Sequence, residues 1–353
     1  MDRGWRLTSS ANAGRCYTER VRLSVLDQSP IRSGGTAVDA IHETLELAQI
    51  CERLGYHRYW LAEHHSSRGL AGTSPEVLIG QVAARTSRIR VGSGGVMLSH
   101  YSALKVAEQF RVLETLFPGR IDLGIGRAPG SDQRTAWALA AGGVRDIEQF
   151  PQQIADVVGW LHDRLPGEHP FKDVRAMPAG PTAPEVWLLG SSDASAIYAA
   201  EQGLAFSFAH FINADGGPDV TRLYRERFRP SPELATPLAS AAIWAVCADT
   251  DEEARQLEKC RELALLRLYT GRYGPFPSIE EAEAFPYTAR DLAIIQHTRG
   301  RTVAGTADVV REELETMARA YGVDELVVVT ITHDFKARVR SYELLAEAFG
   351  LKG

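Results

Sequence analysis

The chain has 353 residues, of which 44% are hydrophobic and 24% charged, as in an ordinary globular protein. Its formal net charge of −6 at pH 7 excludes the basic excess typical of nucleic-acid binding proteins. Four widely spaced cysteines without a CxxC pair argue against a disulfide framework or a zinc site and favour a reducing cytoplasm.

Residues 1–20 are polar, carry four arginines and lack the apolar core of a signal peptide. We expect them to form a disordered or loosely attached extension. No apolar run in the chain approaches the roughly 20 residues that a membrane helix needs, so we expect no membrane partner.

From residue 21 onward, short β-rich runs alternate with helical stretches, which predicts a parallel sheet. The eight predicted strands are residues 21–26, 58–61, 89–98, 121–125, 186–189, 204–208, 241–248 and 326–332. Helices are expected after the first three strands and over residues 342–349. Eight strands joined by helices predict one α/β domain, a (β/α)8 TIM barrel over residues 21–353.

Two connections, residues 127–184 and 270–300, are longer than a plain barrel needs. The second is rich in glycine and proline, which predicts a loop-rich insertion. Long loops over a barrel often act as lids, and we expect this role for residues 270–300.

The active site of such a barrel lies at the carboxyl ends of its strands. Six predicted strands are followed by a polar or glycine-rich cluster, at residues 27–30, 63–65, 99–101, 124–127, 190–193 and 210. Each cluster alone can be a loop that caps itself. Because all six should face one mouth of the barrel, this mouth is the predicted site.

Residues 190–195, a run of glycine, serine, aspartate and alanine, lie between a predicted strand and a helix. Backbone N–H groups at a helix N-terminus bind phosphate, and hydroxyl side chains add donors. The alternative is that Ser192 or Asp193 only caps the helix. Arg127 follows the fourth strand and can pair with a phosphate, an anionic ring or a surface carboxylate.

The run Glu63-His64-His65 is not expected to bind a metal, because neighbouring side chains on an extended segment point to opposite sides. A histidine at a barrel mouth suits general acid/base work or a hydrogen bond to an anion. The alternative is a structural histidine bonded to a backbone carbonyl. The glycines at 92, 94 and 95 indicate either the close approach of a flat ring or tight barrel packing.

Five segments occur in order with family-like spacing, at residues 59–65, 91–95, 124–127, 190–192 and 303–306. Together they resemble the bacterial-luciferase-like flavin oxidoreductases, over about residues 21–349. Residues 126–134 and 208–210 resemble one bacterial branch, the single-chain luciferase-like monooxygenases, of which some take part in antibiotic biosynthesis.

The resemblance implies a monooxygenase that uses reduced FMN and O2, through a C4a-hydroperoxyflavin, to oxygenate a small organic substrate of aromatic or polyketide type. His64 matches the histidine that serves this chemistry. The implied cofactor contacts are Gly94, Gly95, Arg127, Gly190, Ser191, Ser192 and Ser195. The residues expected near the substrate or behind these contacts are Glu63, His65, His100 and His210. The luciferases carry a reactive cysteine where this chain has Gly126, which argues against light emission.

No NAD(P)H site is evident, so the resemblance implies a separate flavin reductase as partner, and relatives are often homodimers. Two alternatives within the fold stay open: a deazaflavin-dependent oxidoreductase that needs no O2, and a flavin-binding protein without turnover. A metal-free hydrolase has little support, because neither Gly-x-Ser-x-Gly nor a clear pair of catalytic carboxylates occurs.

Overall fold

The computed structural model describes residues 21–127, 132–140 and 147–353. The predicted extension, residues 1–20, and residues 128–131 of the segment 126–134 lie outside the described residues. Eight parallel strands form the barrel: β1 (Arg22–Asp27), β2 (Arg58–Leu61), β3 (Arg90–Ser93), β5 (Ile121–Gly126), β6 (Glu185–Gly190), β7 (Ala205–Ala209), β8 (Ala239–Cys247) and β10 (Glu325–Val329). Because β10 pairs with both β8 and β1, the sheet closes, which confirms the predicted barrel.

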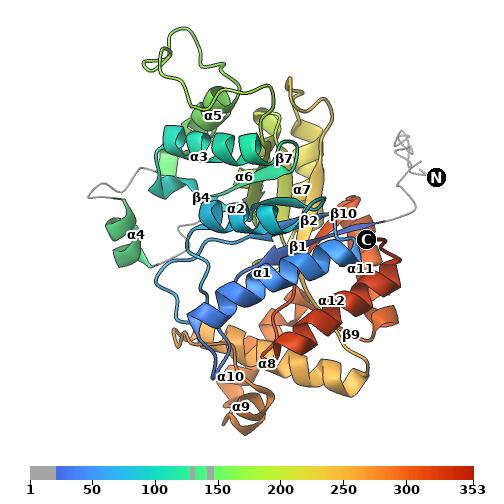
Figure 1. Cartoon of the computed structure of the whole chain (residues 1–353). Helices are drawn as coiled ribbons and strands as arrows, with labels where there is room; N and C mark the ends of the chain where they lie inside the picture. Colours follow the sequence, from blue (N-terminus) through green and yellow to red (C-terminus); the bar gives the residue numbers. More distant parts are fainter. Residues whose placement is uncertain (1–20, 128–131, 141–146) are drawn as a thin grey trace, which may run out of the picture.

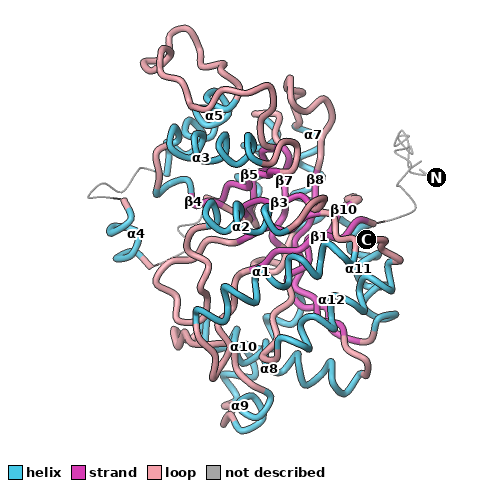
Figure 2. Tube along the Cα trace, viewed as in Figure 1, coloured by secondary structure: helices cyan, strands magenta, loops and turns pink. Residues whose placement is uncertain are grey.

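Helices surround the strands, which lie at the centre of the molecule (Figures 1 and 2). Those flanking the barrel are α1 (Ala37–Leu54), α2 (Pro75–Arg85), α3 (Ala103–Leu116), α5 (Phe150–Leu161), α6 (Asp193–Glu201), α7 (Gly217–Arg227), α11 (Ala307–Tyr321) and α12 (Phe335–Phe349). The first of them has clear end signals in the sequence. Thr36 and Asp39 form a capping box at its start, and Gly55 ends it in the left-handed conformation, at φ 88°. Across the described residues, no helix is long and apolar enough to span a bilayer.

The predicted third strand, residues 89–98, is divided into β3 and a short strand β4 (Val96–Met97), which pairs with β5. The peptide bond between Gly94 and Gly95, at the point of division, is cis. A further strand, β9 (Thr302–Gly305), was not predicted. It pairs with the last four residues of β8, whereas β7 pairs with the first four, so β9 extends the wall beyond the end of β7.

Residues 270–300 contain more helix than their glycine and proline content predicted. The long helix α8 (Asp251–Tyr269) is followed by α9 (Ile279–Ala284) and α10 (Ala289–Thr298), and both short helices pack against it. Ser278 caps α9, and Thr288 caps α10. Phe276 pairs by backbone hydrogen bonds with the segment after β1, which places this insertion at the carboxyl end of the barrel.

The opposite, amino-terminal end of the barrel is filled by buried charges. Arg58 forms ion pairs of 2.8–2.9 Å with Asp122, Glu185 and Glu325, all from the first residues of their strands. The indole of Trp60 donates a hydrogen bond to Asp122 from the layer above. These paired charges fill the interior of the barrel at its amino-terminal end.

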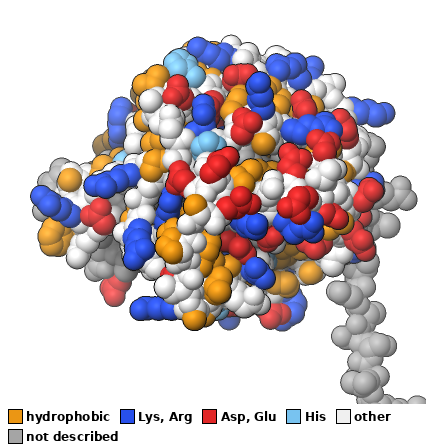
Figure 3. Space-filling model, turned by 90° about the horizontal axis from the view of Figure 1, so that it is seen from below, with side chains coloured by type: hydrophobic (Ala, Val, Ile, Leu, Met, Phe, Trp, Pro, Cys, Tyr) orange, Lys and Arg blue, Asp and Glu red, His pale blue; other side chains and the backbone are white. Residues whose placement is uncertain are grey.

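The outer surface carries both signs of charge. Figure 3 shows Lys and Arg side chains interspersed with Asp and Glu side chains over the face seen from below. Such a mixed surface offers no electrostatic footprint for a polyanion on this face.

Candidate active site

A cavity of about 240 Å³ opens at the carboxyl ends of β3, β5, β6, β7 and β8. It is lined by all seven residues that the resemblance implied as cofactor contacts: Gly94, Gly95, Arg127, Gly190, Ser191, Ser192 and Ser195. These residues come from three separate segments of the chain, residues 94–95, 127 and 190–195. The structure therefore brings the predicted cofactor set together at the predicted mouth of the barrel.

The glycines at 94 and 95 lie against the floor and wall of this cavity. A Cβ atom on Gly94 would come within 2.5 Å of Leu26 Cδ1, and one on Gly95 within 2.8 Å of Leu189 Cδ1. Because Leu26 and Leu189 also line the cavity, any larger residue would displace its apolar surface. The packing at these glycines is tight, as one of the two interpretations has it, and their backbone also borders an open cavity.

The polar end of the cavity lies at the start of α6. Ser192 occupies the N-cap position, but its side chain accepts no capping hydrogen bond. Asp193 instead accepts a bond from the N–H of Ala194, at 2.8 Å. The Ser195 side chain packs against Gly190, where a Cβ atom would come within 2.2 Å of its Oγ. The Ser192 hydroxyl thus faces a cavity without a capping role, which favours the phosphate interpretation over the simple N-cap.

Glu63 lies behind the cavity rather than in it. Its buried carboxylate accepts hydrogen bonds from the Tyr101 hydroxyl at 2.7 Å and from the N–H of Met97 at 2.9 Å. It also bonds to Nε2 of His65, at 2.7 Å. Since Met97 lines the cavity, Glu63 links the loop after β2 to the cavity wall.

His64 has an open hydrogen-bonding position. Its side chain is half-buried, and Nδ1 is buried without a partner in the described part of the chain. Burial lowers its pKa to about 4, against the opposing effect of the Glu63 carboxylate. The imidazole is therefore neutral at pH 7, and its Nδ1 is open to a hydrogen bond. His64 is not one of the residues that line the cavity.

The other two predicted histidines lie apart from the cavity lining. The ring of His100 packs edge-on against that of His65, with 6.1 Å between centroids. His210 is buried, and its two nitrogens contact the Tyr321 hydroxyl at 2.7 Å and the carbonyl of Gly300 at 3.0 Å. These contacts give His210 a structural role, in which it connects the end of β7 to the segment before β9.

Sequence reasoning missed the apolar part of the cavity. These lining residues are Leu26, Trp60, Met97, Leu189, Ala209, Phe211, Ile212 and Ala242, together with Ser207. Most are the inward-facing residues at strand ends, and alternation along each predicted strand could have identified them. Their apolar character suits the flat ring of a cofactor.

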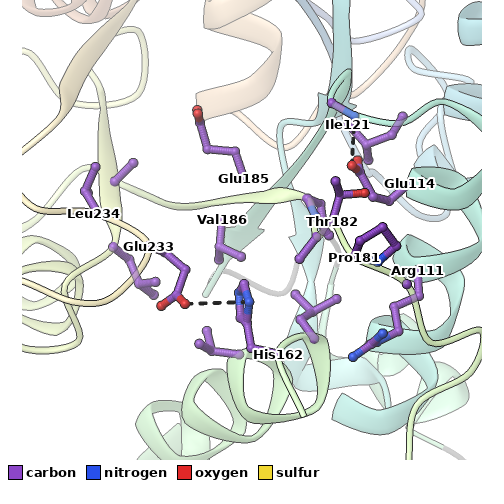
Figure 4. A pocket seen from close by; sticks show the side chains of 18 of the residues that line it. Arg111, Glu114, Ile121, His162, Pro181, Thr182, Glu185, Val186, Glu233 and Leu234 are labelled. Atoms are coloured by element: carbon purple, nitrogen blue, oxygen red, sulfur yellow. Dashed lines mark hydrogen bonds and ion pairs between the residues drawn. The ribbon is translucent and has the colours of Figure 1, made fainter. Parts of the chain in front are cut away.

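A larger cavity, of about 540 Å³, lies at the amino-terminal end of the barrel (Figure 4). It is lined by residues such as Glu114, Glu185 and Glu233, and Figure 4 shows Glu233 directed toward His162, 3.6 Å away. None of the predicted site residues lines it. Since catalytic residues of such barrels lie at the other end, we assign the active site to the smaller cavity.

The comparisons with known proteins point to one family. A family model described as luciferase-like monooxygenase matches residues 21–325. The chain is 50% identical over 333 residues to the protein YwcH of Bacillus subtilis (strain 168), covering 93% of this chain and 99% of that protein. It is 40% identical over 330 residues to the N-acetyl-S-alkylcysteine monooxygenase of the same organism, covering 93% and 98%.

Among solved structures, that of apo-MsnO8 has a TM-score of 0.87 and 39% sequence identity, and the match covers 94% of this chain and 98% of that one. The family and the barrel that the sequence predicted are both confirmed. The chain belongs to the luciferase-like monooxygenase family.

Proposed function

We propose that this chain is an FMN-dependent monooxygenase that transfers one oxygen atom of O2 to a small organic substrate. The observation that carries the proposal is the cavity at the carboxyl end of the barrel, which contains the whole predicted cofactor set. In the overall reaction one oxygen atom enters the substrate and the other leaves as water, while reduced FMN is oxidised. FMN supplies the electrons for this chemistry when bound, and the protein supplies position and environment.

The residues present fit such a cofactor. Gly94 and Gly95 have no side chains that would hold a flat ring away from the barrel wall, and Leu26 and Leu189 would offer it an apolar surface. At the other end, the start of α6 and the uncommitted hydroxyl of Ser192 suit a phosphate. The guanidinium of Arg127, also in the lining, adds a positive charge for the phosphate or the ring.

We assign His64 to proton transfer at the reacting end. The support for this role is its neutral imidazole, whose Nδ1 is buried without a partner. Glu63 positions the neighbouring wall through Met97 and holds His65 and Tyr101 in place. Water must be kept from such a site, and we propose that residues 270–300, which adjoin the segment after β1, contribute to this exclusion.

The partners proposed are a separate flavin reductase that delivers reduced FMN, and a second copy of the chain. A cytoplasmic location is also proposed, since the three described cysteines, Cys51, Cys247 and Cys260, are free and buried. The relative at 40% identity is named for N-acetyl-S-alkylcysteines. We therefore take this class as the first substrates to assay, beside aromatic and polyketide compounds.

Cofactor binding is the first test. The protein is titrated with FMN, riboflavin and the deazaflavin F420, and flavin fluorescence is followed. We expect quenching with FMN and weaker binding of riboflavin, which lacks the phosphate. Absence of FMN binding would overturn the proposal, and preferential binding of F420 would establish the deazaflavin alternative.

Turnover is the second test. The protein is supplied with a flavin reductase, NADH, FMN and ¹⁸O2, and the substrates above are analysed by mass spectrometry. One ¹⁸O atom per product molecule is expected. FMN binding without labelled product from any substrate would point to the flavin-binding alternative. His64→Gln should retain FMN and lose turnover, whereas unchanged turnover would remove His64 from the mechanism.

A further inference from the structure

Arg261 of α8 is a buried cation without an acidic partner. Its side chain is 7% exposed, and its Nε donates a hydrogen bond to Thr302 Oγ1, at 3.1 Å. It forms no ion pair with any carboxylate in residues 21–127, 132–140 or 147–353. A buried charge of this kind is costly unless an anion neutralises it.

Trp244 presents a second donor without an acceptor at the same place. It is 1% exposed, and its Nε1 has no hydrogen-bond partner among the described residues. The guanidinium carbon of Arg261 lies 4.2 Å from the centroid of the indole ring. Trp244 and Thr302 are direct neighbours in the register of β8 and β9, so the three side chains form one group.

Three glutamates of this region are paired with other cations. Ion pairs join Glu262 to Arg299, Glu281 to Arg267 and Glu283 to Lys259. The charged neighbour that does act on Arg261 is a second cation, Arg301. Burial, and to a smaller degree Arg301, lower the pKa of Arg261 to about 9. In the described part of the chain, this buried positive charge therefore has no carboxylate as an ion-pair partner.

This group lies next to the candidate active site. Trp244 and Ala242 alternate with outward residues on β8 and pack in the same inward-facing cluster, and Ala242 lines the cofactor cavity. Two residues along a strand correspond to about 7 Å. The helix α8 covers this part of β8 and β9 from the inner side, in that same cluster. Neither Arg261 nor Trp244 lines the cavity, so an anion at this group would lie outside the cavity lining, two residues along β8 from Ala242.

We propose that Arg261 and Trp244 form an anion-binding subsite that receives a carboxylate group of the organic substrate. The inference deepens the proposed function, on which it rests, because it specifies the substrate class as organic anions. The guanidinium supplies the charge and the indole N–H a directed donor. Arg301, half-buried and stacked on the exposed ring of Tyr269, provides a positive approach from solvent.

The test compares carboxylates with their neutral amides. Two carboxylates, benzoate and N-acetyl-S-methylcysteine, and their neutral carboxamides are the ligands. Each ligand is titrated calorimetrically into the wild type, Arg261→Met and Trp244→Phe, with and without FMN. The control is Arg255→Met, on the same helix, whose side chain is 62% exposed and pairs with Glu252. The wild type and the control should bind the carboxylates about tenfold more tightly than the amides, and Arg261→Met should lose this preference.

Two further results separate this subsite from other roles. Without ligand, the Tm of Arg261→Met should equal or exceed that of the wild type, because an unpaired buried charge has been removed. A lower Tm with an unchanged carboxylate preference would overturn the proposal and leave Arg261 a structural residue. Lack of carboxylate binding to the wild type would overturn it too.

The cofactor phosphate is the other source of an anion. If Arg261→Met weakens FMN but not riboflavin, the residue belongs to the phosphate and the proposal fails. Carboxylate binding is also measured without flavin. If the protein does not bind FMN, the proposed function fails, and the carboxylate titrations without flavin still test the subsite independently.

Discussion

The carboxylate of Glu63 accepts a hydrogen bond from the backbone N–H of Met97, with 2.9 Å between Oε2 and N. The two residues are 34 positions apart in the sequence, and the bond connects the loop after β2 to the segment after Gly94 and Gly95. Glu63 is fully buried, so this contact and those to His65 and Tyr101 are protected from water. The shape of the cavity therefore depends on a side chain that does not line it.

Glu63→Gln should weaken both the fold and FMN binding. The Glu63 carboxylate accepts from His65, Met97 and Tyr101, but a glutamine would turn its NH2 group toward one of these donors. That donor would be buried without an acceptor, which reduces the free energy of unfolding by about 1–3 kcal/mol. FMN affinity should fall as well, because Met97, which lines the cavity, loses its hydrogen bond to the carboxylate. Denaturant unfolding and FMN titration measure the two effects.

The control for this variant is Glu108→Gln on α3, where Lys105 lies 4.0 Å away in a solvent-exposed pair. It should change neither quantity noticeably. If Glu63→Gln behaves like Glu108→Gln, the carboxylate does not position the cavity wall.

Ser192→Ala should reduce FMN affinity and leave the stability of the protein unchanged. Its hydroxyl makes no capping bond, so the loss of one hydrogen bond to phosphate, about 1 kcal/mol, should appear only in FMN binding. Riboflavin affinity should stay the same. Ser278→Ala is the matched control, since Ser278 does cap its helix, with 3.2 Å to the N–H of Glu281.

The control should show the reverse pattern. Loss of its capping hydrogen bond should reduce the free energy of unfolding by about 1 kcal/mol and so lower the Tm, while the affinity for FMN stays unchanged. A fall in Tm without a change in FMN affinity for Ser192→Ala would mean that the hydroxyl serves the helix and not the cofactor.

The barrel was predictable because its strands are buried on both faces and read as short apolar runs between turn signals. β9 was missed because its four residues include alanine and glycine, which give no strand signal of their own. The helices α9 and α10 were missed because neighbouring glycines and prolines outweighed the capping residues Ser278 and Thr288.

Arg127 and Ser192 follow predicted strands, so their place at the mouth of the barrel was predictable from strand ends. Gly94 was expected inside the third strand, and its place beside them followed only from the family resemblance. The group of Arg261 and Trp244 was not, because a single arginine on a helix carries no pattern. Only the tertiary structure shows that it is buried and has no acidic partner.

His64 should make the stability of the wild type depend on pH in mildly acidic solution. Burial lowers its pKa from 6.5 to about 4 in the folded state, so between these values the unfolded chain binds more protons. The free energy of unfolding should therefore fall as the pH decreases from 6.5 toward 4. His64→Gln removes the group and should flatten this dependence by up to about 1.4 kcal/mol per pH unit.

Urea unfolding of both proteins at several pH values measures the difference in slope. Other histidines with lowered pKa, such as His57 and His210, are present in both proteins and cancel in the comparison. Parallel curves would show that the His64 ring is protonated in the folded protein as easily as in the unfolded chain.

Arg58→Met should be among the most destabilising single substitutions in the barrel. It removes the cation between Asp122 and Glu325, whose side chains are 0% and 1% exposed, and leaves their negative charges buried. Removal of one partner from such a group typically costs about 3–5 kcal/mol.

Arg22→Met is the control, because Arg22 also approaches Glu325, at 3.7 Å, but its side chain is 47% exposed. The control should cost less than about 1 kcal/mol in denaturant unfolding. Since Arg58 lies at the amino-terminal end of the barrel, FMN affinity of the folded fraction should be unchanged in both variants. Equal losses of stability would contradict the view that burial, rather than ion pairing as such, makes Arg58 necessary.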